Sequence, residues 1–190
     1  MNRLTWYPEK RRPGNYGKQG PDLAFIRLPL SSVAAIKAKK SFYDLTQDRS
    51  LQASTSDGPL AILGSPEKCF DLHPLAHGSE QFVIAKILTL LSDFEATDIR
   101  EEWDFLDVKL YPEPEPSPLP DSFGGLSGSP VFRFPKTKDL RFEEWPKVEP
   151  VLAGVVFWQE RLDSQTRSLR AHGPISIYNT FLRQLRNWIP

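Results

Sequence analysis

The chain has 190 residues, a length that suits one domain of ordinary size or two small barrels that share an interface. Its 24 basic side chains balance 24 acidic ones, so it lacks the surplus positive charge by which nucleic-acid binders displace phosphate counterions. No uncharged apolar stretch reaches the roughly 20 residues that a membrane span needs. One cysteine, Cys69, excludes an internal disulfide, and residues 1–12 lack the apolar segment of a signal peptide. We therefore expect a cytoplasmic protein that binds neither nucleic acid nor a membrane.

The 18 prolines of the sequence argue against a helical bundle and favour a mainly β protein interrupted by turns. Residues 1–21 combine proline, glycine and basic side chains, which predicts an irregular arm. The apolar run 23–28 is bounded by proline on both sides and predicts a short buried strand. Because serine favours the first position of a helix, we expect Ser31 to cap a short helix that ends near Lys40.

The rest of the chain alternates between predicted strands and turns. Compact or alternating apolar runs predict strands at residues 60–64, 82–91, 103–110, 130–134, 151–158 and 168–172. Proline at every second position from 112 to 120 predicts a stiff surface connection, which serves either as a spacer or as a docking site for a proline-binding partner. Apolar residues at helical spacing beside two arginines predict an amphipathic helix over 178–189.

The loop at residues 121–130 reads Asp-Ser-Phe-Gly-Gly-Leu-Ser-Gly-Ser-Pro and suits acyl-transfer chemistry. A nucleophilic hydroxyl needs backbone N–H groups beside it to hold the oxyanion of the tetrahedral intermediate. Gly125 has no side chain to cover its N–H, and a tight turn directs this group and the N–H of Ser127 towards one point. The alternative is an ordinary turn rich in glycine and serine.

Residues 125–130 and the strand after them resemble the nucleophile loop of trypsin-like serine peptidases, most closely in its bacterial and viral forms. Other segments resemble the same family in the same order along the chain. They are the strand with the family's triad aspartate at 22–28, the turn that opens the second barrel at 62–66, the start of the nucleophile loop at 121–122, the substrate-lining strand at 152–158 and the closing helix that ends at 187–189.

The resemblance implies a mainly β fold of two antiparallel barrels, with the active site in the cleft between them and a helix at the C-terminus. Residues 1–59 would be a remnant of the first barrel that carries the aspartate strand, and residues 60–190 would be the second barrel. Because few residues precede the aspartate strand, we expect the first barrel to be incomplete.

The resemblance also assigns the catalytic residues. It makes Ser127 the nucleophile, Asp22 the carboxylate that orients the base, and the N–H groups of Gly125 and Ser127 the oxyanion hole. This chemistry uses neither a cofactor nor a metal ion, so we expect none.

Four further residues are assigned to substrate binding: Asp121, Phe157, Trp158 and His172. Asp121 would give a preference for Lys or Arg through a charge pair. His172 is either a polar residue of the pocket or a hydrogen-bonded histidine at the end of a strand. Gln159 follows Trp158 where the family prefers glycine, and we expect it to narrow the pocket entrance.

The family's general base is missing from its place ahead of Asp22, because the three histidines are His73, His77 and His172. A serine hydroxyl is a weak nucleophile until a base accepts its proton. We therefore expect either a shortened product of a peptidase gene or a degenerate relative. The predicted function is that of a serine endopeptidase, impaired here, which acts on a peptide or protein through an acyl-enzyme on Ser127. The alternative is an inactive domain of the same fold that binds a peptide or protein.

Overall fold

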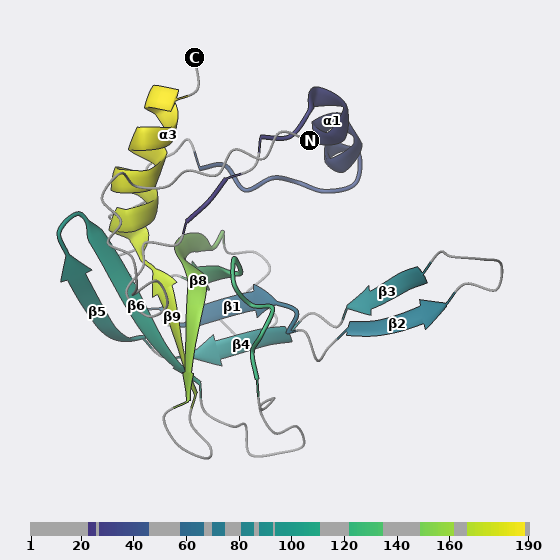
Figure 1. Ribbon diagram of the computed structural model, residues 1–190. Helices are drawn as coiled ribbons and strands as arrows, with labels where there is room; N and C mark the ends of the chain where they lie inside the picture. Colours follow the sequence, from purple (N-terminus) through teal and green to yellow (C-terminus); the bar gives the residue numbers. More distant parts are fainter. Residues whose placement is uncertain are drawn as a thin grey trace, which may run out of the picture.

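The computed structural model describes residues 23–25, 27–45, 58–66, 70–74, 81–85, 88–92, 94–110, 122–134, 149–161 and 167–188. In this part the chain is mainly β, with a helix near each end (Figure 1). The strands are β1 Leu60–Gly64, β2 Phe70–Pro74, β3 Gln81–Ala85, β4 Leu88–Ser92, β5 Phe94–Arg100, β6 Trp103–Leu110, β7 Pro130–Arg133, β8 Val151–Arg161 and β9 Arg167–His172. The helices are α1 Leu30–Lys37, the π-helical segment η3 Ile175–Phe181 and its continuation α3 Leu182–Trp188.

Seven of these strands form one antiparallel sheet in the order β4-β1-β7-β8-β9-β6-β5. The order places β1 beside the late strand β7, and it places β9 between β8 and β6, so the two halves of the sequence are interleaved. Strands β2 and β3 form a separate hairpin, which extends away from the sheet (Figure 1).

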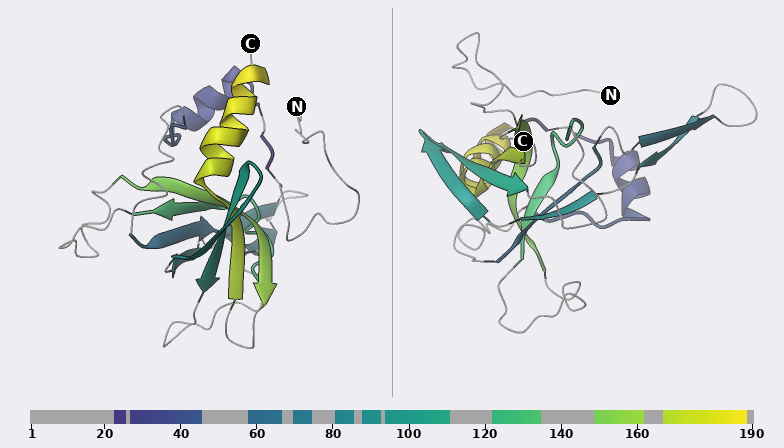
Figure 2. Two further views of the ribbon diagram at one scale, coloured as in Figure 1. Left: turned by 90° about the vertical axis from the view of Figure 1, so that its left-hand side faces the viewer. Right: turned by 90° about the horizontal axis from the view of Figure 1, so that it is seen from below.

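The sheet is strongly curved (Figure 2). Register shifts interrupt the pairing of β7 with β8 after Val131 and the pairing of β8 with β9 after Val156. Such bulges bend a strand and increase its twist. The curvature brings the edge strand β4 to β6, where the hydroxyl of Ser92 donates a hydrogen bond to the carbonyl of Lys109. No strand ladder joins β4 to β6 in the described residues, so the sheet is not a closed barrel.

The prediction of a mainly β fold with a C-terminal helix is confirmed. The described strands do not by themselves form a double barrel of trypsin type, so that fold remains a proposal. The division of the chain between residues 59 and 60 also remains a proposal.

The core consists of apolar side chains from strands that lie far apart in the sequence. Alternate residues of a strand point to one face, and β1, β6 and β9 accordingly contribute every second residue. The largest cluster comprises Leu60, Ile62, Leu106, Val108, Leu110, Phe123, Leu126, Val131, Val151, Ala153, Val156, Leu169 and Ala171.

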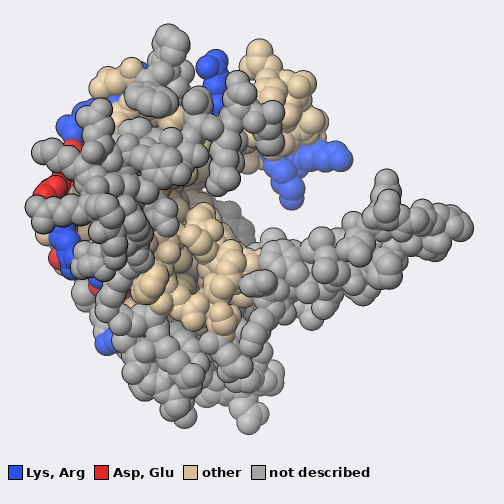
Figure 3. Space-filling model, viewed as in Figure 1, with Lys and Arg blue, Asp and Glu red and all other residues tan. Residues whose placement is uncertain are grey.

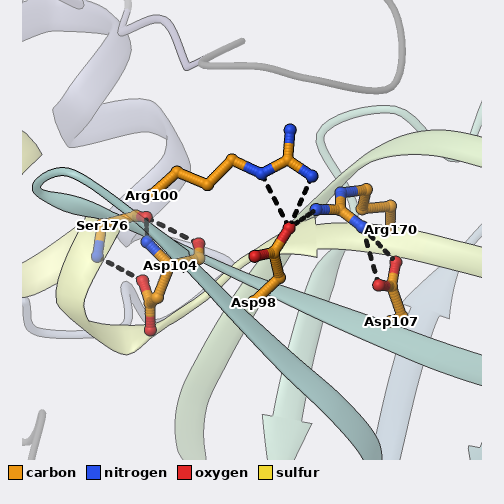
Figure 4. Close-up of polar contacts among 6 residues, drawn as sticks. All are labelled: Asp98, Arg100, Asp104, Asp107, Arg170 and Ser176. Carbon is orange, nitrogen blue, oxygen red and sulfur yellow. Dashed lines mark hydrogen bonds and ion pairs between the residues drawn. The ribbon is translucent and has the colours of Figure 1, made fainter.

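The C-terminal helix is held at its start by Asp104 of β6 (Figure 4). The carboxylate of Asp104 accepts hydrogen bonds from the N–H groups of Ile175 at 3.1 Å and Ser176 at 2.6 Å. The Ser176 hydroxyl in turn accepts from the Asp104 N–H and donates to the Asp104 carbonyl, both at 2.8 Å. These bonds satisfy N–H groups that a helix start leaves without partners. The helix therefore begins near residue 174 rather than at the predicted residue 178.

The prediction of a buried strand at 23–28 is wrong, because the described residues 23–25 and 27–28 belong to no strand. Leu23 packs among Trp103, Phe105 and Phe157, and the ring of Phe25 meets that of Phe181 edge-on at 6.2 Å. These side chains cover the end of the sheet without extending its ladder.

The helix α1 begins at Leu30 after Pro29 and has no side-chain cap, so Ser31 lies inside it. None of its residues is buried. The space-filling view shows basic side chains at α1, and both signs of charge over the side of β5 (Figure 3). No helix in the described residues is long and apolar enough to cross a membrane.

One other strand prediction needs correction. The apolar run 82–91 divides into β3 and β4 rather than forming one strand, and the sequence did not predict β2 or β5. The proline-rich segment 112–120 lies outside the described residues.

Candidate functional site

The loop 122–129 joins the segment after β6 to β7 through two consecutive tight turns. The N–H of Leu126 donates to the carbonyl of Phe123 at 3.0 Å, and the N–H of Ser129 donates to the carbonyl of Leu126 at 2.9 Å. Gly125 and Gly128 have φ angles of 92° and 89°. Glycine adopts this half of conformational space without a Cβ penalty, so both glycines are required by the path of the loop.

Two backbone hydrogen bonds fasten the end of this loop to β8. The N–H of Gly128 donates to the carbonyl of Val156 at 2.8 Å, and the N–H of Val156 donates to the carbonyl of Ser129 at 2.9 Å. The side chains of Phe123 and Leu126 anchor the loop in the core, with 2% and 1% of their surface exposed. The loop is therefore fixed on both sides.

Ser127 lies on the outer side of this fixed loop and is exposed, as is Gly125. Neither residue makes a hydrogen bond within the described part of the chain through its N–H, and neither does the Ser127 hydroxyl. Two backbone N–H groups and one hydroxyl within three exposed residues thus make no hydrogen bond to a described residue. This arrangement can accept a carbonyl oxygen or an oxyanion next to a nucleophile.

A cavity of about 320 Å³ opens beside Ser127. Its lining consists of Phe123, Gly124, Gly125, Leu126, Ser127, Val156, Phe157, Trp158, Gln159 and Leu169. The volume is at the lower end of the roughly 300–1,000 Å³ typical of ligand sites, so it suits one side chain better than a large ligand. The Oε1 atom of Gln159 accepts a hydrogen bond from the N–H of Phe123 at 2.7 Å, which joins β8 to the loop.

The structure brings together four of the residues assigned from the sequence: Gly125, Ser127, Phe157 and Trp158 all line this cavity. Asp22 and Asp121 lie outside the described residues, and so does His77. Their relation to Ser127 stays a prediction. His73 lies on β2, in the hairpin that extends away from the sheet (Figure 1).

His172 lies in the interior and does not line the cavity. It is 0% exposed, and its ring stacks on Phe157 with centroids 4.5 Å apart. Trp103 and Phe105 enclose it at 5.7 Å and 5.3 Å. Burial, and secondarily the positive charge of Arg170, lowers the pKa of His172 to about 3, so the imidazole is neutral near pH 7. The imidazole therefore packs against Phe157, which lines the cavity.

An ion-pair cluster surrounds Arg170, and the sequence patterns did not predict it (Figure 4). The guanidinium donates to both carboxylate oxygens of Asp107 at 3.0 Å and 2.7 Å, and to Asp98 at 2.8 Å. It also lies 4.8 Å from the ring centroid of Phe105. The pairing of Asp107 with Arg170 depends on the register of β6 and β9, which the sequence pattern does not predict. The charges satisfy one another, which indicates a structural role.

No group of His, Cys, Asp and Glu side chains in the described residues could hold a metal ion. No family model, curated protein or solved structure matches this chain. The resemblance to trypsin-like peptidases therefore depends on the chain's own residues.

Proposed function

We propose that the loop 122–129 and the cavity beside it form a serine-peptidase-type site that receives an extended peptide. A peptide carbonyl oxygen binds the N–H groups of Gly125 and Ser127, and the neighbouring side chain enters the cavity against Phe157 and Trp158. On this proposal, the curved sheet corresponds to the second barrel of a trypsin-type fold, and the approach of β4 to β6 is consistent with that assignment.

The reaction of such a site is acyl transfer. The Ser127 Oγ bonds to the carbonyl carbon of a peptide bond while its proton passes to a base. The C–N bond then breaks, the leaving amine takes a proton, and water later hydrolyses the ester. No described imidazole lines the cavity, so we expect turnover to be weak. Peptide binding needs no base, so we expect it to be measurable.

One observation carries this proposal: an exposed serine hydroxyl stands at the mouth of a cavity, with two backbone N–H groups that make no hydrogen bond to any described residue. The aromatic side chains of Phe157 and Trp158, which line the cavity next to the loop, distinguish this loop from an ordinary glycine-serine turn. The fixed path of the loop also matches what catalysis demands, because donors aimed in advance need no rearrangement.

The second candidate function is a binding module that grips a peptide without cutting it. The position of His172 favours this alternative, because its imidazole is fully buried behind Phe157 and is neutral near pH 7. The two candidates share the binding step and differ only in turnover.

The test uses the full chain and two probes. A peptide boronic acid forms a reversible tetrahedral adduct with a serine hydroxyl and reports the oxyanion site, while a fluorogenic peptide reports turnover. We expect the boronate to bind the wild type and the exposed-serine control Ser31→Ala equally well, and to bind Ser127→Ala at least ten-fold more weakly. Loss of any turnover in Ser127→Ala supports the peptidase, and binding without turnover supports the module. Equal boronate binding by wild type and Ser127→Ala overturns the peptidase, and no measurable boronate or peptide binding by either protein overturns both candidates.

A further inference from the structure

We propose that Gln159 sets the size of the side chain that the cavity accepts, and that the cavity takes a compact apolar side chain. This inference rests on the proposed function, since it names the substrate class of the same site. It concerns the wall of the cavity and not the nucleophile.

Gln159 joins the two walls of the cavity. Its backbone belongs to β8, where it pairs with Leu169, and both residues line the cavity. Its side chain crosses to the loop, where Oε1 accepts the 2.7 Å hydrogen bond from the Phe123 N–H. A long glutamine side chain is flexible, but here it is held at both ends.

The donor of this hydrogen bond, the N–H of Phe123, is held in place by the buried Phe123 side chain. The Phe123 ring is 2% exposed and belongs to the largest core cluster, which fixes the position of its backbone N–H. A bulky ligand that displaced Gln159 would leave this N–H without its acceptor, and an unsatisfied polar group in a poorly hydrated place is costly. The hydrogen bond therefore resists widening of the cavity.

The chemistry of the remaining lining favours an apolar occupant. The residues that face the cavity include Leu126, Val156, Phe157 and Leu169, and no described residue of its lining is charged. A lysine or arginine side chain would lose hydration there without gaining a carboxylate from these residues. The preference for Lys or Arg, expected from Asp121, rests on a residue outside the described part of the chain.

The experiment measures dissociation constants for three peptide boronic acids that differ only in the side chain next to boron. The side chains are those of leucine, of naphthylalanine and of lysine. We expect wild type to bind the leucine probe about ten-fold or more tightly than either other probe, since a misfit group in an apolar pocket loses about that much.

The variants separate the role of Gln159 from general damage. In Gln159→Ala, and in Gln159→Ser as a second opened variant, we expect the naphthyl probe to gain at least ten-fold relative to the leucine probe. Gln159→Glu keeps an oxygen acceptor at the same reach, so it should retain the wild-type exclusion of the naphthyl probe. Thermal unfolding of each variant checks that it is folded.

The role of Gln159 and the apolar substrate class are tested by different results. If the ratio of the leucine and naphthyl dissociation constants in both opened variants equals that of wild type, the role of Gln159 is overturned. Tightest binding of the lysine probe by wild type overturns the apolar substrate class. In both cases the proposed function stands, provided that binding still depends on Ser127; loss of that dependence overturns the proposed function itself.

Discussion

The imidazole of His172 stacks on the ring of Phe157 at a centroid distance of 4.5 Å, so a residue that lines the cavity is supported by a titratable group in the core. Trp103 and Phe105 complete the enclosure of the imidazole. The ring of Phe157 therefore contacts the buried imidazole and also lines the cavity.

Stability should fall as the pH is lowered from 7 to 5, because of His172. Its pKa is about 3 in the folded chain, against an ordinary value of 6.5, so below pH 6.5 the unfolded chain binds a proton that the folded chain refuses. The contribution is fully present above pH 6.5 and is lost progressively down to pH 3. At about 1.4 kcal/mol per pH unit, the loss between pH 7 and 5 is about 2 kcal/mol. Urea unfolding at both pH values measures it.

The matched variant for this prediction is His172→Leu, which keeps an apolar side chain and cannot titrate. Its free energy of unfolding should change less between pH 7 and 5 than that of wild type. The window stays above the range in which carboxylates such as Asp98 titrate, whose pKa is lowered mainly by the hydrogen bond from Arg100. Equal pH slopes in the two proteins would contradict the assignment.

Gly64 should tolerate no side chain. A Cβ atom there would overlap the Oγ of Ser129 and the Cδ2 of Leu126. The carbonyl of Ser129 binds the Val156 N–H of β8, and the Leu126 side chain lies in the core. Overpacking of this kind costs about 1–3 kcal/mol. Gly64→Ala should therefore lower the urea midpoint, and it should weaken boronate binding because it displaces the loop.

Gly128→Ala is the comparison for Gly64→Ala. A Cβ at Gly128 meets nothing within 4 Å, so the packing around Leu126 is undisturbed. Its cost comes only from the φ of 89°, at about 1 kcal/mol. A wild-type midpoint for Gly64→Ala would show that the loop can move away from β1 without loss, against this prediction.

Strand positions were predictable wherever the local pattern decides them. The alternation at 103–110 gives β6 with its bounds unchanged, and the later apolar runs give β7 to β9 to within a few residues. The run 82–91 was not predictable in the same way, because periodicity does not show where an apolar run divides into two strands. Strand order and register depend on contacts between distant segments, which a single sequence does not display.

The same distinction applies to the candidate site. Gly125 and Ser127 were predicted because one short loop contains them, and Phe157 and Trp158 because their strand resembles the family's substrate-lining strand. The hydrogen bond between Gln159 and Phe123 joins residues 36 positions apart, so the sequence suggested a narrowed entrance but not its mechanism. The enclosure of His172 depends on side chains of β6, and nothing local to His172 predicts it.

Loss of the Asp104 carboxylate should loosen the C-terminal helix. Asp104→Asn replaces one acceptor oxygen by a donor, which faces the N–H of Ile175 or Ser176. Hydrogen bonds to a charged group contribute about 1.5–3 kcal/mol, and we expect a loss in this range. The free energy of unfolding and the helical circular dichroism signal measure it. Ser176→Ala removes the bonds to the Asp104 backbone and should cost less, since Asp104 keeps its carboxylate.

Loss of Arg170 should destabilise the sheet more than loss of its exposed neighbour Arg100. The Arg170 side chain is 8% exposed and holds carboxylates from two strands, whereas Arg100 is 49% exposed and pairs only with Asp98 among the described residues. Exposed pairs contribute little, so Arg100→Ala should stay within about 0.5 kcal/mol of wild type.

For Arg170→Met, we expect a loss of about 1–3 kcal/mol, below the usual cost of breaking a buried pair, because Asp98 and Asp107 remain 37% and 30% exposed and can be hydrated. Arg170→Lys keeps the charge but has one nitrogen in place of the two that separately bind Asp107 and Asp98, so its stability should lie between the other two. Removal of the positive charge should also raise the pKa of His172, which imidazole proton resonances can follow. Equal stability of Arg170→Met and Arg100→Ala would mean that the cluster is as dispensable as an ordinary surface pair.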